Sequence, residues 1–141
     1  MHSRFASLSP WCVLALAAVT LGARSSGGDT KRVAPGTWGA NGIAMEVTAS
    51  GARIEYDCAH GTITGPLVLD ADGRFAVKGR HYQEHGGQVR DGEDSNGQPV
   101  RYTGQVTGDT MTLAVTPEAS DTAISSHTLA RGKTGRLHKC L

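Results

Sequence analysis

Over most of the chain, apolar and polar residues alternate with a period of two. In the segment 43–48 (IAMEVT), the side chains of Ile43, Met45 and Val47 share one face, and polar or small residues take the other. The segment 52–58 (ARIEYDC) repeats the pattern after a short turn. Such alternation is typical of β-strands that have one buried face and one solvated face.

The same alternation returns further along the chain, between turn residues. It is found at 67–69, 75–79, 100–106, 111–115 and about 123–131. Gly108 and Asp109 form a two-residue hairpin signal between two of these segments. No stretch beyond the first 26 residues has convincing helical periodicity. We therefore predict an all-β domain, a single small antiparallel β-barrel or a sandwich, with about seven to eight strands mostly in up-and-down order. A closed barrel is favoured because closure removes exposed strand edges.

The first 26 residues follow a different pattern. A basic residue, Arg4, precedes an apolar run from Trp11 to about Ala23, and small residues follow the run. The run is shorter than the roughly 20 apolar residues that cross a bilayer. Its order of basic, apolar and small residues matches a secretory signal peptide. We therefore expect export to the periplasm or the medium, with no membrane insertion after the leader is cleaved.

These patterns divide the chain into three parts. Residues 1–26 are the expected signal peptide, and the polar, aperiodic residues 27–35 are expected to form a flexible mature N-terminus. Residues 36–141 make up the predicted β-barrel domain.

The charge of the mature chain is close to neutral. Removing the leader takes away Arg4 and Arg24, which leaves 12 basic residues against 13 acidic ones. A net charge near −1 gives no electrostatic reason to expect a nucleic acid or an anionic membrane surface as partner.

Two cysteines remain in the mature chain, because Cys12 leaves with the leader. An even number of cysteines in an oxidising compartment predicts a disulfide between Cys58 and Cys140, with two free thiols as the alternative. The bond would close a loop of roughly 80 residues, and the chain-entropy model gives such a loop about 4 kcal/mol of stabilisation.

The segment 81–85 (HYQEH) has the H-x-x-E-H spacing of an inverted zinc-peptidase motif. That motif requires a helix, which brings residues four apart onto one face. Here the preceding residues alternate as in a strand, where positions four apart are separated by about 13 Å. The segment is therefore interpreted as a strand end at the barrel rim, not as a one-metal chelate.

Three histidines are candidates for a shared site. Extending the inward strand phases places His60, His81 and His127 at one end of the barrel. If they converge, they form a zinc or copper site or a pH-sensitive polar cluster. Convergence depends on strand order, which a single sequence does not reveal. Our main expectation is that the protein has no cofactor, with zinc or copper as the alternative.

The segment Gly36-Thr37-Trp38 resembles the Gly-x-Trp first strand of the calycin group, the avidin-like and lipocalin-like barrels. In lipocalins an arginine near the last strand packs across that tryptophan, and the resemblance gives Arg131 this role. The chain is also similar to uncharacterised exported bacterial proteins with E-Y-D-C-A-H-G and E-H-G-G segments, here 55–61 and 84–87.

No nucleophile elbow, phosphate-binding glycine loop or Cys-x-x-Cys pair is present in the sequence. We therefore expect a protein that is not an enzyme: an exported binding module on a small β-barrel, which takes a small apolar ligand of unknown identity. One alternative is an interaction or structural protein of the cell envelope, which binds an envelope protein on its outer surface. Another is a histidine-based metal-binding protein.

Overall fold

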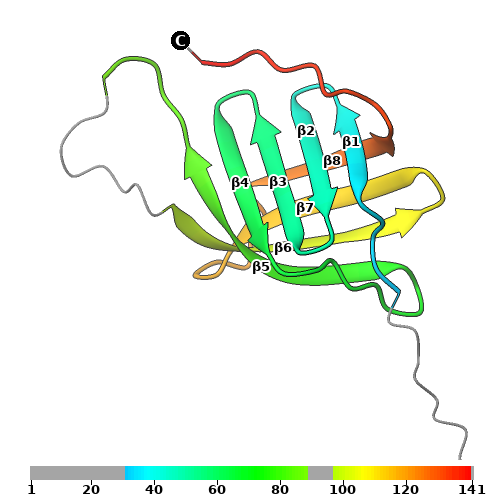
Figure 1. The fold of residues 1–141 in the computed structure, drawn as a ribbon. Coiled ribbons are helices and arrows are strands. Elements are labelled where there is room, and N and C mark those ends of the chain that lie inside the picture. Colours follow the sequence, from blue (N-terminus) through cyan, green and yellow to red (C-terminus); the bar gives the residue numbers. More distant parts are fainter. Residues whose placement is uncertain (1–30, 89–96, 141) are drawn as a thin grey trace, which may run out of the picture.

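The computed structural model describes residues 31–88 and 97–140, so the expected signal peptide lies outside the described residues. Within them the chain forms a closed antiparallel barrel in which every strand pairs with the next and the last returns to the first (Figure 1). The strands are β1 (Gly36–Ala40), β2 (Ile43–Thr48), β3 (Gly51–Tyr56), β4 (Ala59–Thr64), β5 (Arg74–Gln83), β6 (Gln98–Thr107), β7 (Thr110–Pro117) and β8 (Ser125–Arg131). The predicted all-β, up-and-down barrel is confirmed. Among the described residues, no helix is long and apolar enough to span a membrane.

The alternation in the sequence sets which side chains face inward. In β2 the buried residues are Ile43, Met45 and Val47, as the period-two pattern predicts. The expected hairpin at Gly108 and Asp109 is also confirmed, because Thr107 pairs with Thr110 across it. The barrel interior is lined by one continuous apolar cluster, which includes Trp38, Ile43, Met45, Val47, Ile54, Ile63, Phe75, Val100, Tyr102, Met111, Leu113, Val115 and Leu129.

Tyr102 of β6 fills the middle of the barrel because two positions facing it are glycine. Its ring lies over Gly79, and its hydroxyl reaches Gly61 and donates a hydrogen bond of 2.8 Å to the carbonyl of Arg80. A methyl group at either glycine would overlap Tyr102. The phenol is therefore completely buried, and its polar end is satisfied by the backbone.

Trp38, the middle residue of β1, is buried with 1% of its surface exposed. The guanidinium carbon of Arg131 lies 4.9 Å from the centroid of the tryptophan ring. The two residues face each other in the ladder between β1 and β8. The packing of arginine on tryptophan that the resemblance implied is therefore present.

Residues 31–33 correct one expectation, because this part of the segment 27–35 is held against the barrel. The amide of Val33 donates to the carbonyl of Leu67 at 2.9 Å, and the amide of Leu69 donates to the carbonyl of Lys31 at 2.8 Å. All three apolar side chains are buried. Residues 31–33 and the link from β4 to β5 thus lie together at one end of the barrel (Figure 1).

The C-terminal tail (residues 132–140) runs along the opposite end of the barrel, past the turns β1–β2 and β3–β4 (Figure 1). Arg136 bridges to Asn41 in the first turn, and the amide of His138 donates to Asp57 Oδ1 at 2.7 Å in the second. Cys140 forms a disulfide with Cys58, with a Cα separation of 5.2 Å. The predicted disulfide is confirmed, and it ties the tail to the rim of the barrel.

The fit of Tyr102 against the glycines predicts a specific rescue. Gly61→Ala should lower the free energy of unfolding by about 1–3 kcal/mol, because the new methyl overlaps the Tyr102 hydroxyl. Tyr102→Phe alone should cost about 1 kcal/mol through the lost hydrogen bond. Since phenylalanine removes the overlapping oxygen, the double variant should lose clearly less than the sum in urea unfolding.

Gly79→Ala is the matched control, because its methyl would overlap ring carbons of Tyr102 and the carbonyl oxygen of Thr62, which Tyr102→Phe leaves in place. The losses in free energy of unfolding caused by Gly79→Ala and Tyr102→Phe should therefore be additive in their double variant. Additive losses for Gly61→Ala with Tyr102→Phe would contradict the described packing.

Candidate functional site

The three candidate histidines do not share one site, because His60 faces outward. The turn between β3 and β4 consists of two residues, so Tyr56 pairs with Ala59 and the inward positions continue through Ala59 and Gly61. His60 instead lies opposite Glu55 on the outer face. The inward and outward alternation of β3 does not continue in phase through this turn. The expected set of His60, His81 and His127 is therefore wrong.

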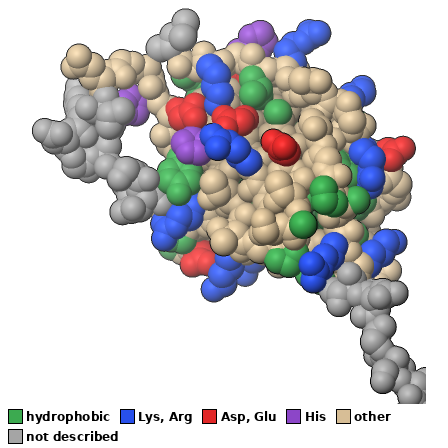
Figure 2. Space-filling view, viewed as in Figure 1, with side chains coloured by type: hydrophobic (Ala, Val, Ile, Leu, Met, Phe, Trp, Pro, Cys, Tyr) green, Lys and Arg blue, Asp and Glu red, His purple; other side chains and the backbone are tan. Residues whose placement is uncertain are grey.

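On the outer face His60 belongs to an outer polar cluster, formed with Glu55, Glu84 and Lys139. His60 Nδ1 lies 2.7 Å from Glu84 Oε1, and Lys139 Nζ lies 3.1 Å from Glu84 Oε2 and 2.8 Å from Glu55 Oε2. The His60 ring also stacks on Tyr82, at a centroid distance of 4.6 Å. Figure 2 shows acidic, basic and histidine side chains gathered on this face.

The outer polar cluster is best explained as an attachment for the C-terminal tail. Partial burial acts to raise the pKa of Glu84. The hydrogen bonds from His60 and Lys139 outweigh this effect and hold the pKa below its usual value. All of these side chains remain partly exposed, and such ion pairs contribute little stability individually. The cluster also explains the H-x-x-E-H spacing: Glu84 binds His60 on the outer face, while His81 is buried.

The other two histidines point into a cavity at the rim beside the C-terminal tail, which we name the mouth pocket. Its volume is about 310 Å³. Tyr56 lies between the histidines, with its ring centroid 5.4 Å from that of His81 and 5.6 Å from that of His127. The lining residues are Gly42, Tyr56, Asp57, Cys58, Ala59, His81, Gln83, Ile124, Ser125 and His127.

The mouth pocket holds buried polar atoms that have no partner. In the part of the chain that the structure describes, three buried side-chain atoms lack a hydrogen bond: Tyr56 Oη, His81 Nδ1 and Ser125 Oγ. All three residues line this pocket, and Tyr56 and His81 are only 7% and 8% exposed. An unsatisfied buried polar group costs about 1–3 kcal/mol. Because all three residues line one cavity, the mouth pocket is the candidate ligand site of the described chain.

The sequence alone pointed to His81 and His127 but missed Tyr56 and Ser125. Tyr56 was recognised only as an inward position of its strand, and Ser125 lies at the start of the last strand. Both residues are polar and stand at the inward end of a strand, which is the signal in the sequence. Placing them next to an inward histidine requires the strand order, which brings β3, β5 and β8 to the same rim.

The titratable groups deep in the mouth pocket favour their neutral forms. Burial lowers the pKa of His81, and the nearby His60 lowers it further. Burial also lowers the pKa of His127, although Asp57 opposes the shift. Burial raises the pKa of Tyr56, and the neighbouring Ser125 hydroxyl opposes the rise.

Among the described residues that line the pocket, Asp57 is the one carboxylate, and none is a lysine or arginine. Its Oδ1 accepts the amide hydrogen of His138, and its carbonyl accepts that of Cys140 at 3.2 Å. Asp57 therefore joins the rim of the pocket to the C-terminal tail.

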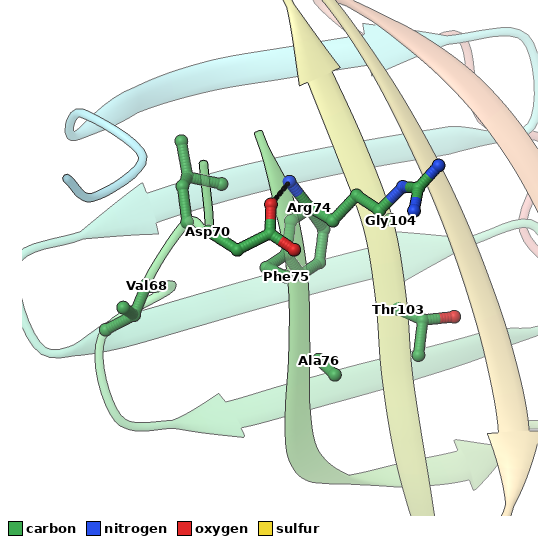
Figure 3. Close-up of a pocket in the computed structure, with 8 residues that line it drawn as sticks. Val68, Asp70, Arg74, Phe75, Ala76, Thr103 and Gly104 are labelled. Carbon is green, nitrogen blue, oxygen red and sulfur yellow. Dashed lines mark hydrogen bonds between the residues drawn. The ribbon is translucent and has the colours of Figure 1, made fainter. Parts of the chain in front are cut away.

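A second hollow, of about 560 Å³, lies between the segment 68–70 and strands β5 and β6 (Figure 3). Asp70 Oδ1 accepts hydrogen bonds of 2.9 Å from the amides of Asp72 and Arg74, and the Arg74 side chain extends away from Asp70. None of the unpartnered buried atoms lies here. The hollow is larger than the mouth pocket, but its described polar contacts serve the turn that leads into β5.

Across residues 31–88 and 97–140, no three side chains of histidine, cysteine, aspartate or glutamate gather as a metal-binding group. No family model, curated protein or solved structure matches this chain. Inferences about function therefore rest on the geometry of the barrel and of the mouth pocket.

The lowered pKa values of His81 and His127 predict a pH dependence of stability. Above the ordinary histidine pKa of about 6.5, both ring systems are neutral in the folded and unfolded states. Below this pKa the two histidines bind protons more readily in the unfolded chain than in the folded one. The free energy of unfolding should therefore fall as the pH drops from 7.5 to 5.5.

Nuclear magnetic resonance titration of the imidazole rings should give midpoints below 6.5 for both histidines. The double variant His81→Gln with His127→Gln should lose most of this slope in urea unfolding. Midpoints at or above 6.5 would show that neither ring is desolvated as described.

Proposed function

We propose that the protein is an exported, non-enzymatic binding module that holds one small, largely apolar ligand in the mouth pocket. The observation that carries the proposal is that Tyr56, His81 and Ser125, each with a buried side-chain atom that has no hydrogen-bond partner, all line a single cavity. Such groups are retained where a bound molecule completes their hydrogen bonds.

The barrel architecture supports this function. Barrels of about eight strands are either filled by side chains or hold one small ligand. Here Tyr102 and the apolar cluster fill the interior, while the rim end keeps a cavity of about 310 Å³. That volume lies at the lower end of the range for ligand pockets, about 300–1,000 Å³. It has room for about ten water molecules, or for a ligand of the same volume.

Three features support an exported location and a calycin-like type. The N-terminal sequence has the pattern of a signal peptide, and the disulfide between Cys58 and Cys140 suits an oxidising compartment. The contact of Arg131 with Trp38 is the one that the resemblance to lipocalin-like barrels implies. These features are consistent with a binding protein that meets its ligand outside the cytoplasm.

Binding should be detected by titrating the folded protein with the neutral fragments indole, 2-naphthol and cyclohexanol. We expect saturable shifts of nuclear magnetic resonance signals at Ala59, His81, Ser125 and His127, because these residues line the mouth pocket. Ser125→Leu, which adds apolar bulk to the pocket wall, should weaken binding at least about tenfold.

Thr103→Leu is the matched control, because it adds bulk to the second hollow. It should leave fragment binding unchanged. Shifts confined to Phe75 and its neighbours, or no saturable binding by any of the three fragments, would overturn the proposed function.

A further inference from the structure

We infer that the ligand is a neutral alcohol or phenol, an apolar body that carries a hydroxyl group, and that Tyr56 and His81 bind this hydroxyl. The inference rests on the proposed function and narrows its ligand class. It follows from the chemistry of the unpartnered atoms and from the charges around them.

The unpartnered atoms match a group that both donates and accepts, as a hydroxyl does. Tyr56 Oη and Ser125 Oγ each donate one hydrogen bond and accept others. His81 Nδ1 either donates or accepts, according to the tautomer of the ring. A hydroxyl satisfies both tautomers, because it donates and accepts at once. A carbonyl only accepts and an amide N–H only donates, so each of them serves one tautomer alone.

The charges around the pocket disfavour an anionic ligand. Among residues 31–88 and 97–140, no lysine or arginine lines the cavity, so a carboxylate or phosphate would lose its hydration without gaining a counter-charge from them. Asp57 at the rim would add repulsion. A protonated His81 or His127 would supply a positive charge, but burial disfavours that form of both rings.

An ammonium ligand is also disfavoured at depth. Its only opposite charge among the lining residues is Asp57, and one oxygen of that carboxylate is already bonded to the His138 amide. The groups that lack partners are neutral, and two of them belong to side chains more than nine-tenths buried. A charged nitrogen placed beside them would lose its hydration and gain only hydrogen bonds to neutral groups in return.

The remaining lining provides a surface for the apolar body of the ligand. Ala59 is buried in the pocket wall, and the Tyr56 ring lies edge-on to that of His81 at an angle of 62°. Ile124 stands at the same cavity with 49% of its surface exposed, and it is one of two large apolar side chains so exposed in the described chain. A bound apolar body would cover it, while the hydroxyl reaches the polar atoms below.

A matched series of naphthalenes tests the ligand class: 2-naphthol, 2-methylnaphthalene, 2-naphthoate and 2-naphthylmethylammonium. These probes share one ring system and differ in a single group. At pH 7.5 we expect 2-naphthol to bind about tenfold more tightly than 2-methylnaphthalene, the usual value of one net hydrogen bond. Both charged probes should bind more weakly than 2-naphthol.

Tyr56→Phe should remove most of the preference for 2-naphthol and leave the affinity for 2-methylnaphthalene nearly unchanged. Since it deletes a buried hydroxyl without a partner, it should not lower the melting temperature. Tyr82→Phe is the matched control, because Tyr82 stacks on His60 away from the pocket lining. It should keep the full preference.

The outcomes separate the two proposals. If 2-methylnaphthalene binds as tightly as 2-naphthol, or if a charged probe binds best, the ligand class is wrong while the binding module stands. If no probe of the series binds at the mouth pocket, the binding module itself is wrong. If Tyr56→Phe keeps the tenfold preference, the assignment of Tyr56 as a binding residue fails.

Discussion

The ring of Tyr102, laid across Gly79 and reaching Gly61, determines how the rest of the barrel is used. Tyr102 belongs to the continuous apolar cluster that also includes Trp38, and this cluster fills the interior. The next inward position of β5 beyond Gly79 is His81, and there the cavity begins. A small barrel with few aromatic residues thus has both a packed core and a pocket.

The strands were predictable from the sequence because each needs only local information. The period of two gives the inward face of β2 and β7, and a glycine followed by aspartate gives the turn after β6. The site was less predictable because it depends on register. Counting through a two-residue turn misplaced His60, whereas His127 lies within one strand and was assigned to the correct face. Nothing local indicated that Val33, in a polar segment, would be buried against Leu67.

The rim of the mouth pocket is attached to the C-terminal tail at several points. Gly42, Asp57 and Cys58 line the pocket, and each is bonded to the tail: Gly42 through the carbonyl of Arg136 at 2.8 Å, Asp57 through His138, and Cys58 through the disulfide. The disulfide therefore does more than restrain a terminus. It holds the turn between β3 and β4, which shapes one side of the pocket.

The most direct measurement is a crystal structure of the protein with 2-naphthol bound. The account predicts one molecule in the mouth pocket, with its hydroxyl oxygen within hydrogen-bonding distance of Tyr56 Oη or His81 Nδ1 and its rings against Ile124. A 2-naphthol molecule seated in the hollow beside Phe75, or one in the mouth pocket with its hydroxyl turned out to solvent, would contradict it.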